Sequence, residues 1–192
     1  PKLVTRVCKQ PPTRAALAAM PQVPLDVNKQ MEVEQIAFGT YSPLEGFMGQ
    51  DDFHAVLAKM RLTNGTVWPI PIVLDVSHET AAQLTIGEPV ALTDDRNEVV
   101  ALLYLEEMYE FDAAETAVSL YGTTNSDHPG VRLSRQMKPV LLGGKIDLIR
   151  RRDSATKAYE LTPKQLRRLL DERGWSRVLG VHTSNGIARG DE

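Results

Sequence analysis

Cysteine is almost absent from this chain of 192 residues, in which Cys8 is the only one. A single thiol excludes an intramolecular disulfide and argues against a metal site built from cysteines. His54 and His78 stand singly, without the spacing of a metal-binding pair, so the sequence predicts no bound metal. One cysteine also fits a reducing compartment, and we expect the protein in the cytoplasm.

Long apolar runs are missing as well. The apolar run at residues 99–105 is far shorter than the ~20 residues that cross a bilayer. Prolines and charges interrupt the N-terminal region where the apolar core of a secretion signal would lie. We therefore expect no membrane association.

The chain also has no surplus of positive charge. It contains 22 Lys and Arg residues and 25 Asp and Glu residues, which gives a net charge of −3. This balance, together with an aromatic content of only 6%, disfavours nucleic-acid binding. The 42% hydrophobic and 24% charged residues are ordinary for a folded chain of one or two domains.

No Gly-x-x-x-x-Gly-Lys-Ser/Thr phosphate loop is present, so the sequence contains no kinase of that class. The segment Gly143-Gly144-Lys145 resembles a phosphate loop only superficially. Residues 146–149 after it are strand-like, whereas a phosphate loop needs a helix there. The two glycines instead predict a bulge in a strand.

The first 150 residues mix helix and strand patterns. Proline-flanked or capped apolar periodicity predicts helices near 13–20, 28–39, 51–60 and 112–121. Residues 67–76 carry Pro69 and Pro71 and predict an edge strand, and residues 88–93 and 98–109 predict a hairpin. An irregular stretch around His128, to which we assign a turn-stabilising role, precedes a strand over 139–149. These elements predict an α+β fold with a small β-barrel-like domain and helices at its margins.

A boundary is expected near Arg150, where strand-like residues give way to charge. Thr162-Pro163 then predicts the start of a helix that ends at Gly174. Residues 177–181 predict a buried parallel strand, followed by a polar loop at residues 182–192. Such a loop after a buried strand is where α/β sheets present ligand-binding groups.

Several segments occur in the order found in one enzyme family. They are Ser42-Pro43-Leu44-Glu45-Gly46-Phe47-Met48, Met60-Arg61-Leu62, Asn64-Gly65, Trp68-Pro69-Ile70-Pro71-Ile72, Leu74-Asp75-Val76, His128-Pro129-Gly130-Val131 and Gly143-Gly144. With them the chain resembles the ATP sulfurylase (sulfate adenylyltransferase) family over nearly its whole length.

The resemblance implies a PUA-like β-barrel domain over residues 1–150. Residues 151–192 would then be the first helix and strand of a Rossmann-like α/β nucleotidyltransferase domain, which is incomplete here. Members of the family convert ATP, with magnesium, and sulfate into adenosine 5′-phosphosulfate and pyrophosphate. No cofactor bound by this chain itself is expected.

The family signature Gln-Thr-Arg-Asn-Pro-x-His-Arg-x-His falls on residues 182–191. The resemblance assigns catalytic positions to Thr183 and Asn185 and substrate-binding positions to His182, Ser184 and Arg189. Thr183, Asn185 and Arg189 match the signature, whereas His182 replaces Gln and Ser184 replaces Arg.

The remaining signature positions also depart from the family. Gly186 replaces Pro, and Ala188 and Asp191 replace the two histidines that hold the ATP phosphates. A serine hydroxyl has no charge to offer a sulfate, and Asp191 would repel phosphate. Each lost preorganised donor costs about 10²–10³ in rate, so we expect no turnover by this chain alone.

Two other functions fit the same residues. A sulfurylase-like region can serve as a scaffold or oligomerisation module in a fusion with an adenylylsulfate kinase, so a homo-oligomer and a C-terminal sulfurylase or kinase domain are the expected partners. PUA-like barrels elsewhere bind structured RNA, although the acidic balance of this chain disfavours RNA binding.

Overall fold

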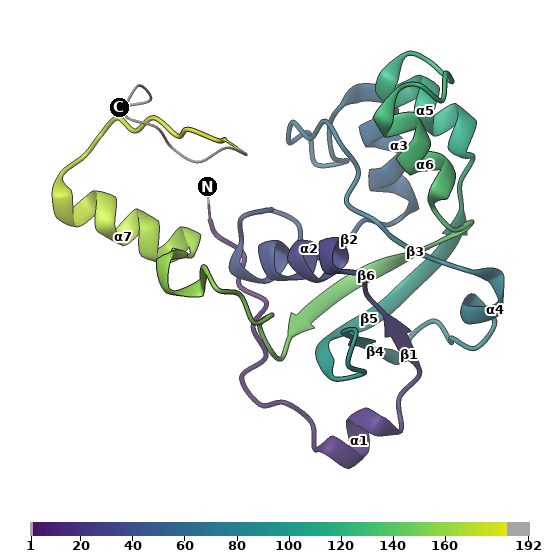
Figure 1. The fold of residues 1–192 in the computed structure, drawn as a ribbon, viewed down its shortest axis with the longest axis horizontal. Helices are drawn as coiled ribbons and strands as arrows, with labels where there is room; N and C mark the ends of the chain where they lie inside the picture. The colour runs from purple at the N-terminus through teal and green to yellow at the C-terminus, as the bar shows by residue number, and fades with distance from the viewer. Residues whose placement is uncertain (1, 184–192) are drawn as a thin grey trace. The chain divides into compact units, whose positions relative to one another are not determined.

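The computed structural model describes residues 2–183, in two compact units over residues 1–160 and 161–192. In the first unit, short helices surround one twisted sheet (Figure 1). Its helices are α1 (Arg14–Ala18), α2 (Val27–Phe38), α3 (Gln50–Lys59), α4 (His78–Ala81), α5 (Ala113–Tyr121) and α6 (Pro129–Gln136), followed by the 3-10 turn η1 (Lys157–Tyr159). Within the described residues, no helix is long and apolar enough to cross a membrane.

Side-chain caps explain where the predicted helices begin and end. Asp26 caps α2 by accepting a hydrogen bond from the backbone N–H of Lys29, and Asp112 caps α5 in the same way. Gly39 and Gly122 end these two helices in the left-handed conformation. The helices predicted near 13–20, 28–39, 51–60 and 112–121 are confirmed.

Helix α6 is an element that the sequence pattern missed. The irregular stretch predicted around His128 instead starts this helix, because His128 Nδ1 accepts a hydrogen bond from the Gly130 N–H. The imidazole also stacks on Tyr121, with ring centroids 4.8 Å apart. His128 is therefore structural, as expected, although it caps a helix rather than a turn.

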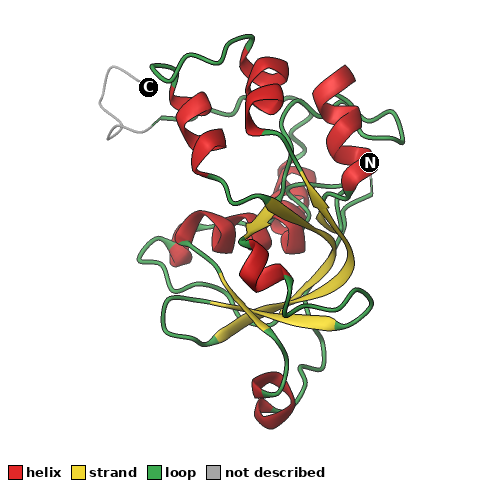
Figure 2. Ribbon diagram, turned by 90° about the vertical axis from the view of Figure 1, so that its right-hand side faces the viewer, coloured by secondary structure: helices red, strands yellow, loops and turns green. Residues whose placement is uncertain are grey.

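The sheet has the order β1-β4-β5-β6-β2, and β3 also pairs with β6. Its strands are β1 (Gln22–Pro24), β2 (Gly46–Phe47), β3 (Leu74–Val76), β4 (Pro89–Thr93), β5 (Val99–Glu110) and β6 (Val140–Leu148). Strands β1 and β4 are parallel and the other pairs are antiparallel. Figure 2 shows how strongly the long strands twist.

The strands of the first unit form a mostly open sheet. Its end strands do not pair with each other, since β1 pairs only with β4 and β2 only with β6. Pro24 ends β1, and the prolines at 69 and 71 leave only Leu74–Val76 of the predicted 67–76 strand in the sheet. The predicted hairpin is confirmed as β4 and β5.

The antiparallel β5–β6 pair runs through the middle of the core. Leu103, Leu105, Leu142 and Ile146 on these strands are fully buried. The register shifts between Leu105 and Glu107, opposite Gly143 and Gly144, so the bulge predicted at the two glycines lies in this pair, on the facing strand.

Two glycines let the backbones of β2 and β5 approach β6 closely. A Cβ atom at Gly46 would lie 1.9 Å from the carbonyl oxygen of Gly144. Gly144 itself has φ +153, and a Cβ there would lie 2.1 Å from the Tyr104 carbonyl oxygen. Only glycine fits at both positions.

The segment after β6 is fastened to α2. Arg151 forms ion pairs with Glu34 and Glu160, and its guanidinium lies 4.9 Å from the Phe38 ring centroid. The backbone N–H of Arg152 also donates to Glu34. These contacts hold the segment that leaves the sheet.

The second unit contains α7 (Pro163–Arg173), which begins with a capping box between Thr162 and Gln165. The predicted helix is thus confirmed, but the strand expected over residues 177–181 is not formed. Leu179 and Val181 are 88% and 80% exposed. A parallel strand needs neighbouring strands, and the described part of this unit, residues 161–183, contains none.

We expect Gly46→Ala to lower the free energy of unfolding by about 3 kcal/mol, because the added methyl would meet backbone atoms that cannot turn away. Urea denaturation measures this. Gly180→Ala is the matched control, since its Cβ would meet nothing within 4 Å. An unchanged unfolding free energy for Gly46→Ala would show that β2 can move away from β6.

Asp94 makes the stability of the β4–β5 hairpin dependent on pH. Its Oδ1 accepts from the N–H groups of Arg96 and Glu98, and its Oδ2 accepts from Arg150 at 2.7 Å. Burial alone would raise the pKa of this carboxyl. The backbone hydrogen bonds and the Arg150 guanidinium outweigh burial and lower the pKa below its ordinary value.

Because the folded pKa is lowered, the charge of Asp94 stabilises the fold above the unfolded pKa of about 3.9 and this stabilisation is lost as the pH falls through the folded pKa. We expect Asp94→Asn to cost about 1 kcal/mol at neutral pH, a difference that shrinks in acid. Thermal unfolding across pH, with the exposed Asp95→Asn as control, measures it. A pH-independent difference would contradict this role.

Candidate functional site

The terminal signature lies mostly beyond the part of the chain that can be described. His182 and Thr183 are exposed and belong to no helix or strand. Ser184, Asn185 and Arg189 lie outside the described residues. The roles assigned to these five residues therefore stay predictions.

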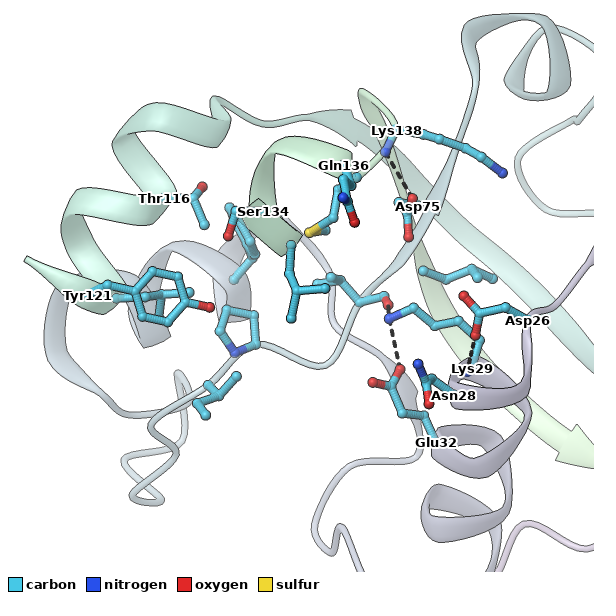
Figure 3. Close-up of a pocket in the computed structure, with 18 of the residues that line it drawn as sticks. Asp26, Asn28, Lys29, Glu32, Asp75, Thr116, Tyr121, Ser134, Gln136 and Lys138 are labelled. Atoms are coloured by element: carbon cyan, nitrogen blue, oxygen red, sulfur yellow. Dashed lines mark hydrogen bonds and ion pairs between the residues drawn. The ribbon is translucent and has the colours of Figure 1, made fainter. Parts of the chain in front are cut away.

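A pocket of about 510 Å³ lies in the first unit (Figure 3). It is bordered by the start of α2, the chain into β3, and the helices α5 and α6. The volume falls within the range of small-molecule sites. Its apolar wall includes Pro71, Leu120, Leu133 and Met137.

Charged groups gather at one end of this pocket. The Lys29 ammonium donates to Glu32 at 2.9 Å and to the Val73 carbonyl at 2.7 Å. One carboxylate oxygen of Asp26 accepts a hydrogen bond from the backbone N–H of Lys29. One carboxylate oxygen of Asp75 accepts a hydrogen bond from the backbone N–H of Lys138. Figure 3 shows these acidic groups around Lys29. The pocket has three carboxylates and two ammonium groups, hence one net negative charge.

Hydroxyl groups lie at the other end, on α5 and α6. Thr116 and Ser134 are each only 4% exposed, and the Tyr121 hydroxyl points into the pocket in Figure 3. No residue of this pocket was predicted as a site from the sequence. Two segments of the family resemblance, at residues 68–72 and 74–76, border the pocket, but nothing in the sequence marks them as a site. Helix α2 is far from α5 and α6 in the chain, so only the tertiary structure shows that these parts meet.

A second pocket, of about 290 Å³, borders the Ser42-to-Met48 segment. The Tyr109 hydroxyl donates to the Met48 carbonyl at 2.8 Å, and burial followed by the charges of Glu107 and Asp52 raises the pKa of Tyr109. The ammonium nitrogen of Lys145 lies 3.3 Å from a carboxylate oxygen of Glu45. These contacts hold this segment of the family resemblance against β5 and β6.

Over residues 2–183, no group of three His, Cys, Asp or Glu side chains is placed to hold a metal ion. The carboxylates of the larger pocket face backbone N–H groups and an ammonium instead. The pocket has hydrogen-bonding groups at both ends of an apolar wall.

Comparison with known families defines the class of this fold. Residues 1–151 match the model of the PUA-like domain. The chain belongs to the PUA-like domain family, which confirms the predicted fold class.

Comparison with individual proteins is more specific. The sulfate adenylyltransferase of Halothermothrix orenii is 40% identical over 196 residues, covering 100% of this chain and 51% of that protein. That of Chloroflexus aurantiacus is 42% identical over 173 residues, covering 90% of this chain and 45% of that protein. The chain thus spans about half the length of these relatives, and the predicted resemblance to sulfate adenylyltransferases is confirmed.

A solved structure has a similar fold. The hexameric APS kinase from Thiobacillus denitrificans superimposes with a TM-score of 0.66 and 27% identity. The match covers 91% of this chain and 31% of that chain. This chain therefore shares its fold with part of an APS kinase.

Proposed function

We propose that this chain is the N-terminal portion of a sulfate adenylyltransferase-like protein of sulfate activation, and that it does not turn over substrate by itself. The observation that carries this proposal is the 40% identity over the whole chain to a protein about twice its length. In such a protein, the PUA-like unit supports a nucleotide-binding unit that begins with α7.

The signature residues support the second half of the proposal. Where the family has the arginine that holds sulfate, this chain has Ser184, and Ala188 and Asp191 stand in place of the two phosphate-binding histidines. Neither a neutral hydroxyl nor a carboxylate can neutralise the charge that develops on a leaving pyrophosphate. Thr183 and Asn185 remain the positions for any surviving ligand contact.

ATP with magnesium, and sulfate, are the substrates that we assign to the whole protein. The acidic pocket of the first unit does not suit these anions, and we assign their binding to the signature positions at residues 182–191. The single cysteine supports a cytoplasmic protein.

We expect the purified chain to release no pyrophosphate above a buffer control when given ATP, magnesium and sulfate in a pyrophosphatase-coupled assay. The full-length Halothermothrix orenii relative is the positive control. Sulfate-dependent release that Asn185→Ala abolishes would overturn the proposal, because it would show a working active site in residues 182–191.

A second function, as an assembly module, is favoured by the likeness to the hexameric APS kinase, of which a chain like this one forms about a third. Apolar side chains of the second unit are available for such packing. Trp175, Val178 and Leu179 are 56%, 60% and 88% exposed.

If the chain is an assembly module, light scattering at increasing concentration will give a mass that is a multiple of the 21.3 kDa chain. Leu179→Ser should shift the distribution toward the single chain, because it removes an exposed apolar side chain. Tyr159→Ser, which changes an 88% exposed residue of the first unit, is the control. A mass of one chain throughout would reject self-association.

A further inference from the structure

The larger pocket of the first unit contains a polar group that neither the fold nor the proposed function uses. Ser134 is 4% exposed, and its hydroxyl makes no hydrogen bond to another group in the described chain. Within residues 2–183, every fully buried side-chain oxygen or nitrogen atom has a hydrogen-bond partner. The Ser134 hydroxyl must therefore open onto the pocket that it lines. A buried hydroxyl of this kind is a hydrogen-bonding group available to a ligand.

Tyr121 supplies a second hydroxyl at the same end. Its ring is fixed by stacking on His128, and its oxygen, which has no partner in the described part of the protein, points into the pocket (Figure 3). A ring held on one face presents its hydroxyl in a fixed direction. The two hydroxyls thus form a preorganised end that can both donate and accept hydrogen bonds.

The opposite end presents negative charge. Lys29 is occupied by Glu32 and the Val73 carbonyl, so its charge is already matched. Asp26 and Asp75 each use one carboxylate oxygen on a backbone N–H, which leaves the other oxygen for a ligand. Neither carboxylate forms an ion pair within the described residues. A cation is therefore the group that this end would hold most strongly.

We propose that this pocket binds a small organic cation, with an amine at the Asp26 and Asp75 end, an apolar body against Pro71 and Met137, and a hydrogen-bonding group at the Ser134 and Tyr121 end. The volume of about 510 Å³ suits a small molecule. This site lies within the PUA-like unit and goes beyond the proposed function. The net negative charge separates it from any site for sulfate or ATP phosphates.

Three related probes test both ends of the site. Tyramine carries an amine, an aromatic ring and a hydroxyl, phenethylamine lacks the hydroxyl, and 4-ethylphenol lacks the amine. In a titration followed by amide chemical shifts, we expect millimolar binding of tyramine, centred on Asp75, Tyr121 and Ser134. The affinity of 4-ethylphenol should be lower by about tenfold, because it forms no charge-assisted hydrogen bond.

Isosteric variants assign each contact. Asp26→Asn with Asp75→Asn keeps the acceptors that cap α2 and bind the Lys138 N–H, yet removes both charges. This double variant should weaken tyramine about tenfold and leave 4-ethylphenol unchanged. Ser134→Ala and Tyr121→Phe should each weaken tyramine by a few fold without lowering the melting temperature, since neither hydroxyl has a protein partner to lose.

Asp95→Asn, an exposed change elsewhere in the same unit, is the charge control and should bind tyramine as the wild type does. The proposal is overturned if tyramine and 4-ethylphenol bind equally, if the double Asn variant binds tyramine normally, or if no shifts occur in the pocket at millimolar probe. None of these results depends on whether the chain releases pyrophosphate.

Discussion

The close backbone contact between β2 and β6 is the constraint on which the rest of the first unit depends. Gly46 allows the backbone of β2 to approach the Gly144 carbonyl of β6 where any side chain would collide. The contact fixes the loop that carries Met48, whose carbonyl is held by Tyr109. Strand β6 also pairs with β5 and β3, so a distortion at the contact between β2 and β6 would also displace β5 and β3.

Local signals in the sequence predicted most of the helices and the main hairpin. Asp26, Asp112 and the glycines at 39 and 122 act within their own turns, so their effect can be inferred without tertiary structure. Helix α6 was not predicted because its eight residues depend on burying Val131 against the rest of the unit. Its polar surface hides the apolar period in the sequence.

The strand expected over residues 177–181 is the reverse case, an element that the sequence predicts and the structure does not form. Its apolar residues fit a buried strand, but burial requires neighbouring strands that the described chain does not supply to it. The pocket was equally beyond prediction, because Asp26, Asp75 and Ser134 come from three separate elements. In the sequence, each of these residues has an ordinary local role or no recognisable role. They form a set of hydrogen-bonding and charged groups only because the fold brings them to one pocket.

The short edges of the sheet have a consequence for how copies of the protein can meet. Strand β1 has three residues and ends at Pro24, and β2 has two. Few backbone N–H and C=O groups are therefore left for a strand from another molecule, and proline offers no donor. Edge-to-edge aggregation is disfavoured, so any ordered association must use side-chain surfaces instead of extending the sheet.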